Sequence, residues 1–130
     1  MIKTTQGENA KAYPILMALG KQKVGVRLSL ELYRLTNRMQ EEWNFYCEKE
    51  QQIVQDCGGI ILPNGTVSFP DDPANPKDPN RPHLKKFQQK RKELDELEVE
   101  LDANPVDIRN DTALTISADE IRACLPFLTV

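Results

Sequence analysis

The sequence has little of the chemistry that enzymes and metal sites need. Its 130 residues include one histidine, His83, three cysteines and six scattered glycines. Cys47 and Cys57 lie ten residues apart with no histidine nearby, which is not a zinc-ligand spacing. No serine or cysteine stands in a nucleophile motif, and no glycine-rich phosphate-binding loop is present. We therefore expect a protein that is not an enzyme and that holds no cofactor and no metal ion.

Long apolar runs are also missing. A membrane-spanning helix needs about 20 consecutive apolar residues, and the longest runs here are much shorter. The N-terminal segment MIKTTQGENAK lacks the apolar centre of a secretory signal. We expect no membrane segment and a cytoplasmic protein, in which Cys47 and Cys124 are reduced and packed in the core.

An excess of positive charge is absent as well. The net charge is −3, so no overall positive field attracts nucleic acid or an anionic membrane. The basic stretch HLKKFQQKRK at 83–92 is an alternative contact site for nucleic acid. Acidic residues follow it directly, and together with the overall charge they argue against nucleic acid as a partner.

The strongest positive pattern predicts a long helix over 26–57. Val26, Leu30 and Tyr33 lie off its main apolar face, so we expect this end of the helix to be buried from more than one side. Gly58 and Gly59 follow the helix and end it. The main face repeats at steps of four and three residues, as in a packed helix, and contains Leu28, Leu32, Leu35, Met39, Tyr46 and Ile53.

A second long helix is predicted over 82–104, with apolar positions at Leu84, Phe87, Leu94 and Leu101. Asn80 is the expected N-cap, Pro82 fits the first turn, and Pro105 marks the end. A shorter helix is predicted to begin near Ala12, because Pro14 is tolerated only in a first turn, and to end at Gly20. Residues 1–8 are expected to be frayed or to form a short edge strand.

The C-terminal segment predicts a short strand over Ala113–Ile116. A capping box, Ser117 with Glu120, then opens a short helix that Pro126 ends or kinks.

Between the long helices lies a segment, 58–81, that is hostile to helix. Asn64-Gly65, flanked by β-forming residues, predicts a β-hairpin with a type I′ turn. The stretch PDDPANPKDPN that follows predicts an extended, proline-rich connector. The segment is expected to reverse the chain, so that the second long helix lies back along the first.

Charge supports an antiparallel pairing of the long helices. The first is basic early and acidic later, and the second is also basic early and acidic later. Unlike charges therefore face one another only in the antiparallel arrangement. One specific hypothesis is that Arg91 lies opposite Glu42, since each interrupts its apolar face with a charge of opposite sign.

These observations predict one domain, 1–130, that is mainly α with minor β. Its centre is an antiparallel hairpin of long helices, with short flanking helices, a small β-hairpin and a proline-rich turn. The first long helix spans about 48 Å at about 1.5 Å per residue, which exceeds the length of its partner. Either the hairpin and the C-terminal segment cover the excess, or another subunit does, and we favour self-association.

A candidate interaction surface lies around the turn, because rigid extended segments bind at low entropic cost. Its predicted members are aromatic residues near the insert, the turn asparagine and two lysines of the basic stretch: Trp43, Phe45, Asn64, Phe69, Lys85 and Lys86.

The order of motifs resembles small proteins of unknown function encoded by tailed bacteriophages and prophages. The shared features are YPILMAL, the joint GKQKVGVRL, the long LELYRLTNRMQEEWNFYCEKEQQIVQ segment, an NG turn, FQQKRKELDELEVEL and ISADEI, over residues 12–121. The insertion DDPANPKDPN departs from that pattern. The resemblance implies a virus-encoded, non-enzymatic protein in the host cytoplasm or in the virion.

The expected function is binding of another protein, of phage or host origin, or of further copies of the chain. Virion assembly, a minor structural part and inhibition of a host factor are the roles considered. The alternative is a small-ligand sponge or regulator with a pocket formed between subunits.

Overall fold

The computed structural model describes residues 1–75 and 77–130. The long elements in this part of the chain are three helices, α1 (Gln6–Leu19), α2 (Val26–Asp56) and α3 (Pro82–Asp95). A short helix α4 (Ala118–Ala123), a 3-10 turn η1 (Leu125–Phe127) and several strands of two to four residues complete the fold. The expectation of a mainly α fold with minor β is confirmed.

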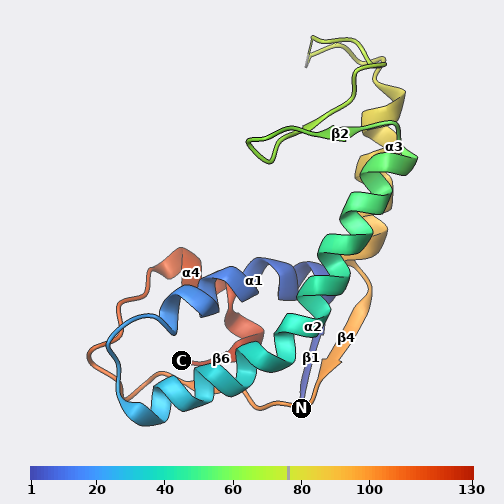
Figure 1. The fold of residues 1–130 in the computed structure, drawn as a ribbon. Helices are drawn as coiled ribbons and strands as arrows, with labels where there is room; N and C mark the ends of the chain where they lie inside the picture. Colours follow the sequence, from blue (N-terminus) through green and yellow to red (C-terminus); the bar gives the residue numbers. More distant parts are fainter. Residues whose placement is uncertain (76) are drawn as a thin grey trace.

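The molecule has two parts, which Figure 1 shows clearly. The body contains α1, the first half of α2, α4 and the short strands near both termini. The second half of α2 projects from the body together with α3 and a small β-hairpin, and we call this projection (residues 46–95) the arm. Helix α3 accompanies only the second half of α2, and the length of α2 predicted to exceed its partner lies in the body, where α1 packs on it.

Helix α1 begins six residues earlier than Ala12. Thr5 caps it by accepting a hydrogen bond from the backbone N–H of Glu8 (3.2 Å), and the same hydroxyl donates to the Glu8 carboxylate (3.2 Å). The exposed Pro14 lies inside the helix. A proline there costs about 3 kcal/mol, which the cap and the burial of one helix face offset: Ala12, Leu16 and Leu19.

Helix α2 has the predicted extent, and five residues of its predicted apolar face are buried: Leu28, Leu32, Leu35, Met39 and Tyr46. The expectation for the start of the helix was wrong. Val26 and Tyr33 are 86% and 63% exposed, and Leu30 is exposed as well. Helix α1 and the strand β5 (Val106–Asp107) do cover this half of α2, but they approach it only from the opposite side.

Helix α3 is shorter than predicted, because its expected last turns form the strand β4 (Glu98–Leu101). The sequence Glu-Val-Glu-Leu alternates exposed and buried side chains, which suits a strand with one buried face. Strand β4 pairs antiparallel with β1 (Ile2–Thr5), so that Ile2 lies opposite Leu101. A long-range pairing thus outweighed the helical propensity of the acidic segment.

The C-terminal segment carries its strands at other positions than predicted. Residues 113–116 form no strand, because the side-chain amide of Gln22 bonds both backbone groups of Thr115, at 2.8 and 2.9 Å. The strands here are β5 and β6 (Leu128–Thr129), which pair in parallel. The capping box of Ser117 and Glu120 is present, as predicted.

The insert forms the predicted β-hairpin, from β2 (Ile60–Ile61) and β3 (Val67–Ser68). Its turn is not type I′, because Gly65 (φ +83°) has positive φ and Asn64 does not. The hydrogen bonds Gly65 N–H to Leu62 O and Leu62 N–H to Thr66 O define a three-residue loop. Pro63 explains the difference, since it lacks the N–H that the type I′ pairing needs and suits the first central position of a type I turn, after Leu62.

Helices α2 and α3 are antiparallel, as predicted. Tyr46 contacts Asp95, Glu50 contacts Arg91, and the end of α2 contacts His83 at the start of α3. Arg91 does not face Glu42. Its guanidinium lies 3.3 Å from Glu50, two turns further along α2, whereas Glu42 accepts a hydrogen bond from Gln6 at the base of α1. The apolar contacts of the arm set this register, and exposed charges are too weak to override them.

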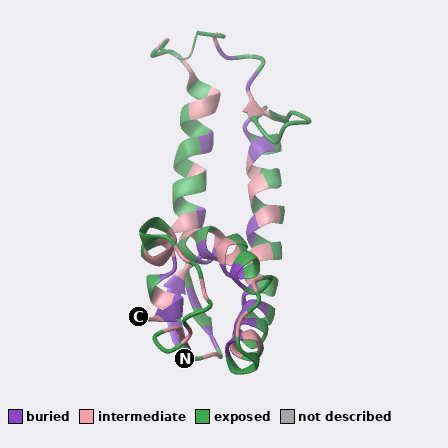
Figure 2. Cartoon of the chain, turned by 90° about the vertical axis from the view of Figure 1, so that its left-hand side faces the viewer, coloured by how far each residue is buried: buried purple, intermediate pink, exposed green. Residues whose placement is uncertain are grey.

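The described residues form two separate apolar cores. The larger fills the body between α1, the first half of α2 and the strands, and includes Leu16, Leu32 and Phe127. The smaller lies in the arm and joins Val54 and Cys57 of α2 to Phe69 and Phe87. Figure 2 shows that buried residues of the arm lie where its elements face one another, while its outer sides are exposed.

Candidate functional site

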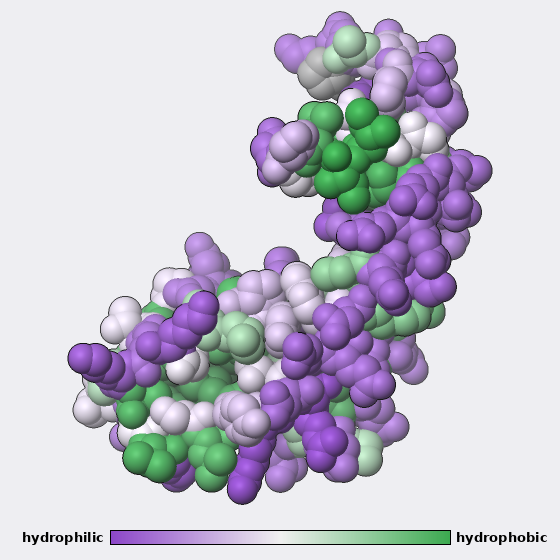
Figure 3. Space-filling model, viewed as in Figure 1, coloured by the Kyte–Doolittle hydropathy of each residue, from purple (hydrophilic) through white to green (hydrophobic). Residues whose placement is uncertain are grey.

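The far end of the arm presents consecutive exposed apolar residues. Ile60 and Ile61 of β2 are each about half exposed, and Leu62 is 36% exposed. Ile60 and Ile61 border a shallow groove of about 340 Å³ between the hairpin and α2, which is also lined by Gln51 and Gln55. Figure 3 shows this apolar area surrounded by hydrophilic surface. Exposed apolar residues grouped in this way mark contact sites more often than scattered ones do.

Two polar contacts hold the end of the arm together. The carboxylate of Asp72, which is buried, accepts hydrogen bonds from the backbone N–H groups of His83 (3.2 Å) and Leu84 (2.9 Å). Asp72 therefore caps α3 in place of the predicted Asn80. The ring Nδ1 of His83 lies 3.0 Å from the carbonyl oxygen of Cys57. Because a carbonyl only accepts, Nδ1 carries the hydrogen and ties α3 to the end of α2.

A second exposed apolar area lies at the start of α2. Val26, Leu30 and Tyr33 follow one another at steps of four and three residues, so they form a stripe along one side of the helix. Beside them, Met17 and Tyr33 border a small groove of about 180 Å³ between α1 and α2. In Figure 3 this area lies on the same face of the molecule as the hairpin.

The structure separates the residues predicted as an interaction surface. Asn64, Lys85 and Lys86 are exposed on the arm. Phe69 is not a surface residue: it is 5% exposed and packs on Phe87 with a centroid distance of 5.5 Å. Trp43 stacks on Tyr13 of α1 (5.2 Å) at the base of the arm, and Phe45 is partly exposed beneath the ammonium group of Lys49.

A polar cleft of about 580 Å³ lies at the elbow, where α1, α2 and α3 meet. Tyr46 donates a 2.7 Å hydrogen bond to Asp95, and Arg91 bonds both the Tyr46 hydroxyl (3.4 Å) and Glu50. Burial raises the pKa of Tyr46 above its usual value of 10.0. The helices approach closely here, since a Cβ on Gly7 would lie 2.9 Å from that of Asp95. Four of the side chains that line the cleft thus bond one another: Tyr46, Asp95, Arg91 and Glu50.

Two of the three thiols, those of Cys47 and Cys124, lie in surroundings that disfavour reactivity. Burial raises the pKa of Cys124 to about 11, and burial together with the charge of Glu50 raises the pKa of Cys47. A raised pKa lowers the thiolate fraction at neutral pH, and the thiolate is the nucleophile. Within residues 1–75 and 77–130, no group of three metal-binding side chains is close enough to hold an ion.

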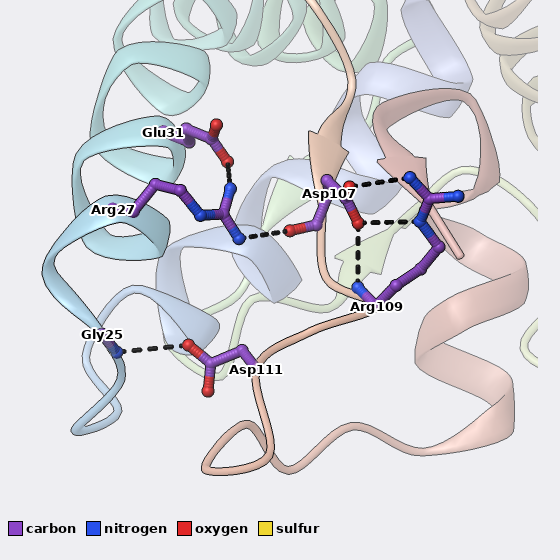
Figure 4. A network of polar contacts seen from close by, with 6 residues as sticks. All are labelled: Gly25, Arg27, Glu31, Asp107, Arg109 and Asp111. Carbon is purple, nitrogen blue, oxygen red and sulfur yellow. Dashed lines mark hydrogen bonds and ion pairs between the residues drawn. The ribbon is translucent and has the colours of Figure 1, made fainter.

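A further polar network joins the C-terminal segment to the start of α2 (Figure 4). Arg27 donates to the backbone oxygen of Asp107 (3.2 Å) and to Glu31 (2.7 Å). Arg109 binds the Asp107 carboxylate through two side-chain contacts and lowers the pKa of Asp107 to about 2. These side chains use their charges on one another and on the backbone of the same chain. The network therefore holds the C-terminal segment against α2.

Comparisons of the chain with protein-family models, with curated proteins and with solved structures find no match. Among the described helices, none combines the length and the apolar character that crossing a membrane requires. The geometry of the chain itself therefore carries the functional argument.

Sequence reasoning missed the apolar residues of the hairpin. Ile60, Ile61 and Leu62 precede the turn that was identified, and a strand with one buried face would alternate them with polar residues. Three apolar residues in succession next to a proline signal a strand with apolar side chains on both faces. In a two-stranded hairpin only one face can be covered by the rest of the chain. The run of three apolar residues therefore indicated that some of them would be exposed.

Proposed function

We propose that this chain is a non-enzymatic protein–protein interaction protein and that the arm carries its contact surface. The observation that carries the proposal is the apolar end of the arm, where Ile60, Ile61 and Leu62 are exposed next to one another. Exposure of such residues in water is unfavourable by about 25 cal/mol per Å² of apolar surface. A partner that covers them gains that free energy.

The way the arm is built supports this function. The hairpin rests on its own small core, and Asp72 and His83 fix the ends of α2 and α3. A contact surface that is ordered before binding loses little conformational entropy in the complex. The arm also projects from the body (Figure 1), which leaves its end accessible to a large partner.

The resemblance to small proteins of tailed bacteriophages supplies the expected setting. A virion component or a factor of the host cell is then the expected kind of partner, with the protein acting in the host cytoplasm or in the virion. Further copies of the same chain belong to the same proposal.

Photo-crosslinking tests the proposal at the arm itself. The photoreactive residue p-benzoylphenylalanine replaces Ile61 in a chain expressed in bacteria with and without phage infection. We expect a crosslinked product heavier than the 14.8 kDa chain, and a lower yield when Ile60→Asp and Leu62→Asp are added. The control carries the photoreactive residue in place of the exposed Asn110 in the body. Equal yields from positions 61 and 110, or no product from position 61, would contradict the proposal.

The alternative function, binding of a small ligand, has the elbow cleft in its favour. The cleft offers the ring of Trp43, the charges of Lys11 and Arg91, and several carboxylates. It lies within one chain, whereas the sequence led us to expect a pocket between subunits. A thermal-shift screen of nucleotides and small metabolites separates the two functions, since Trp43→Ala abolishes a ligand-induced rise in Tm only for a ligand bound in this cleft.

A further inference from the structure

We infer that the partner of the arm is a second copy of this chain, bound antiparallel along the outer side of α2 around a two-fold axis. This inference rests on the proposed function and names its partner. It assigns one role to both exposed apolar areas, the stripe at the start of α2 and the hairpin groove at its end.

The outer side of α2 is continuous over the whole helix. From Val26 to Gln55, exposed residues recur on the side opposite the buried Leu28 and Leu32, at steps of three and four except for the adjacent pair at its centre. This row consists of Val26, Leu30, Tyr33, Asn37, Gln40, Glu41, Asn44, Glu48, Gln51 and Gln55. It is apolar at its beginning, uncharged or acidic in its middle, and bordered by the apolar hairpin at its end.

The two-fold axis of the antiparallel pair passes between Gln40 and Glu41. Each residue of the row then lies opposite another residue of the same row in the second copy. Leu30 then lies opposite Gln51 of the second copy, and Val26 lies opposite Gln55. These two glutamines line the groove beside Ile60 and Ile61. Each copy therefore places its apolar stripe on the apolar groove of the other, and the two-fold axis repeats the contact, as an isologous interface requires.

Charge selects the same arrangement. The first half of α2 carries Arg27, Arg34 and Arg38, of which Arg27 is paired with Glu31. The second half is acidic apart from one lysine, and contains Glu41, Glu42, Glu48, Glu50 and Asp56. Antiparallel pairing brings Arg34 near Glu48 of the second copy and Arg38 near its Glu41. Parallel pairing would bring like charges together, which is unfavourable.

The shape of α2 is compatible with this pairing. Figure 1 shows that the helix changes direction near its middle, where the arm leaves the body. A two-fold axis through this bend exchanges the two halves of the helix, so both copies follow the same path. Both apolar areas lie on one face of the molecule in Figure 3, which is the face that the second copy covers.

Two charge-reversal variants of α2 test the inference, and sedimentation velocity measures their self-association. One variant carries Arg34→Glu and Arg38→Glu, and the other carries Glu41→Lys and Glu48→Lys; all four positions are exposed. We expect the wild type to dimerise and each variant alone to bind itself about tenfold more weakly or worse. An equimolar mixture of the two variants restores the dimer, because each acidic half again faces a basic half. Circular dichroism confirms that the variants are folded.

The matched control carries Lys92→Glu and Arg122→Glu, which change two exposed positive charges outside the row and outside the candidate surface and are expected to leave the dimer unchanged. A wild type that stays monomeric up to about 100 µM, above the micromolar range of weak interfaces, overturns the inference. Variants that dimerise as tightly as the wild type overturn the antiparallel register. A monomeric wild type whose position 61 crosslinks to a different protein overturns this inference and leaves the proposed function supported.

Discussion

Tyr46 of α2 donates a 2.7 Å hydrogen bond to Asp95, the last residue of α3, at the point where the arm meets the body. The contact joins residues 49 positions apart in the chain and holds the two arm helices together at the base of the arm. Arg91 lies beside it and bonds the same hydroxyl. These contacts hold α3 against α2 at the end of the arm that is remote from the hairpin.

Tyr46→Phe is therefore expected to lower the free energy of unfolding by about 1–2 kcal/mol, since a hydrogen bond to a carboxylate is lost at a buried position. Urea denaturation monitored by circular dichroism measures this change. Tyr33→Phe is the matched control, because the Tyr33 side chain is 63% exposed. Equal effects of the two substitutions would contradict the assigned role of the Tyr46 hydroxyl.

The stabilisation by Tyr46 also depends on pH in a defined direction. Its pKa is raised in the folded protein above 10.0, so its contribution is fully present below pH 10. Above that, the unfolded chain ionises first, and the contribution is lost as the pH rises through the folded pKa. The difference in stability between wild type and Tyr46→Phe should thus shrink over the range above about pH 10. A difference that grows over this range would contradict the raised pKa.

Asp72→Ala is expected to destabilise the start of α3. The substitution leaves the N–H groups of His83 and Leu84 without their cap, at a cost of about 1–2 kcal/mol. Hydrogen exchange should become faster at these two amides than in the wild type. Asp71→Ala is the control, because the Asp71 side chain is exposed on the same connector. If both substitutions leave exchange at residue 84 unchanged, Asp72 does not cap the helix.

Phe69→Ala is expected to open the arm while leaving the body folded. Phe69 belongs to the small core of the arm, which shares no buried residue with the core of the body. Removal of a buried phenylalanine ring costs about 3–5 kcal/mol, a large share of what so small a core supplies. Hydrogen exchange should accelerate over residues 60–90 and stay slow around Leu16 and Leu32. Uniform acceleration over the whole chain would show that arm and body unfold as one unit.

The helices of this fold were the part most readily predicted from sequence. The apolar repeat of α2 and the glycines after it predicted its extent, and the charge order predicted the direction of α3. Each of these signals is local or depends on a comparison of two helices. The register between the helices could not be obtained in this way, because it depends on the packing of Phe87 against Phe69, a residue that lies outside both helices.

The strands were harder to predict because they depend on partners distant in sequence. The segment Glu98–Leu101 is a strand only because Ile2–Thr5 lies beside it. Residues 113–116 alternate as a strand would, yet the side chain of Gln22 takes the place of a neighbouring strand. The Thr5-x-x-Glu8 cap is present in the sequence. It was not used, because Pro14 was assigned to the first turn of the helix, which placed the helix start near Ala12.

A candidate surface around the turn stays a prediction, and the sequence did not identify which of its members are exposed. The turn region was singled out, and Asn64, Lys85 and Lys86 are indeed exposed there. Phe69 was misplaced because an aromatic residue in a loop gives no sign of which core it enters. The exposed stripe of Val26, Leu30 and Tyr33 was read as buried, and only the structure shows which sides of α2 the chain itself covers.

The antiparallel pairing of two copies along α2 is tested most directly by crosslinking within the interface. The photoreactive residue p-benzoylphenylalanine replaces the exposed Gln51 in the purified chain, and mass spectrometry identifies the crosslinked peptides. A mixture of chains with light and heavy isotopes separates contacts between copies from contacts within one copy. The account predicts a crosslink from position 51 to the peptide of the other copy that contains Leu30. A crosslink to the segment around position 51 of the other copy, or no crosslink between copies, would contradict it.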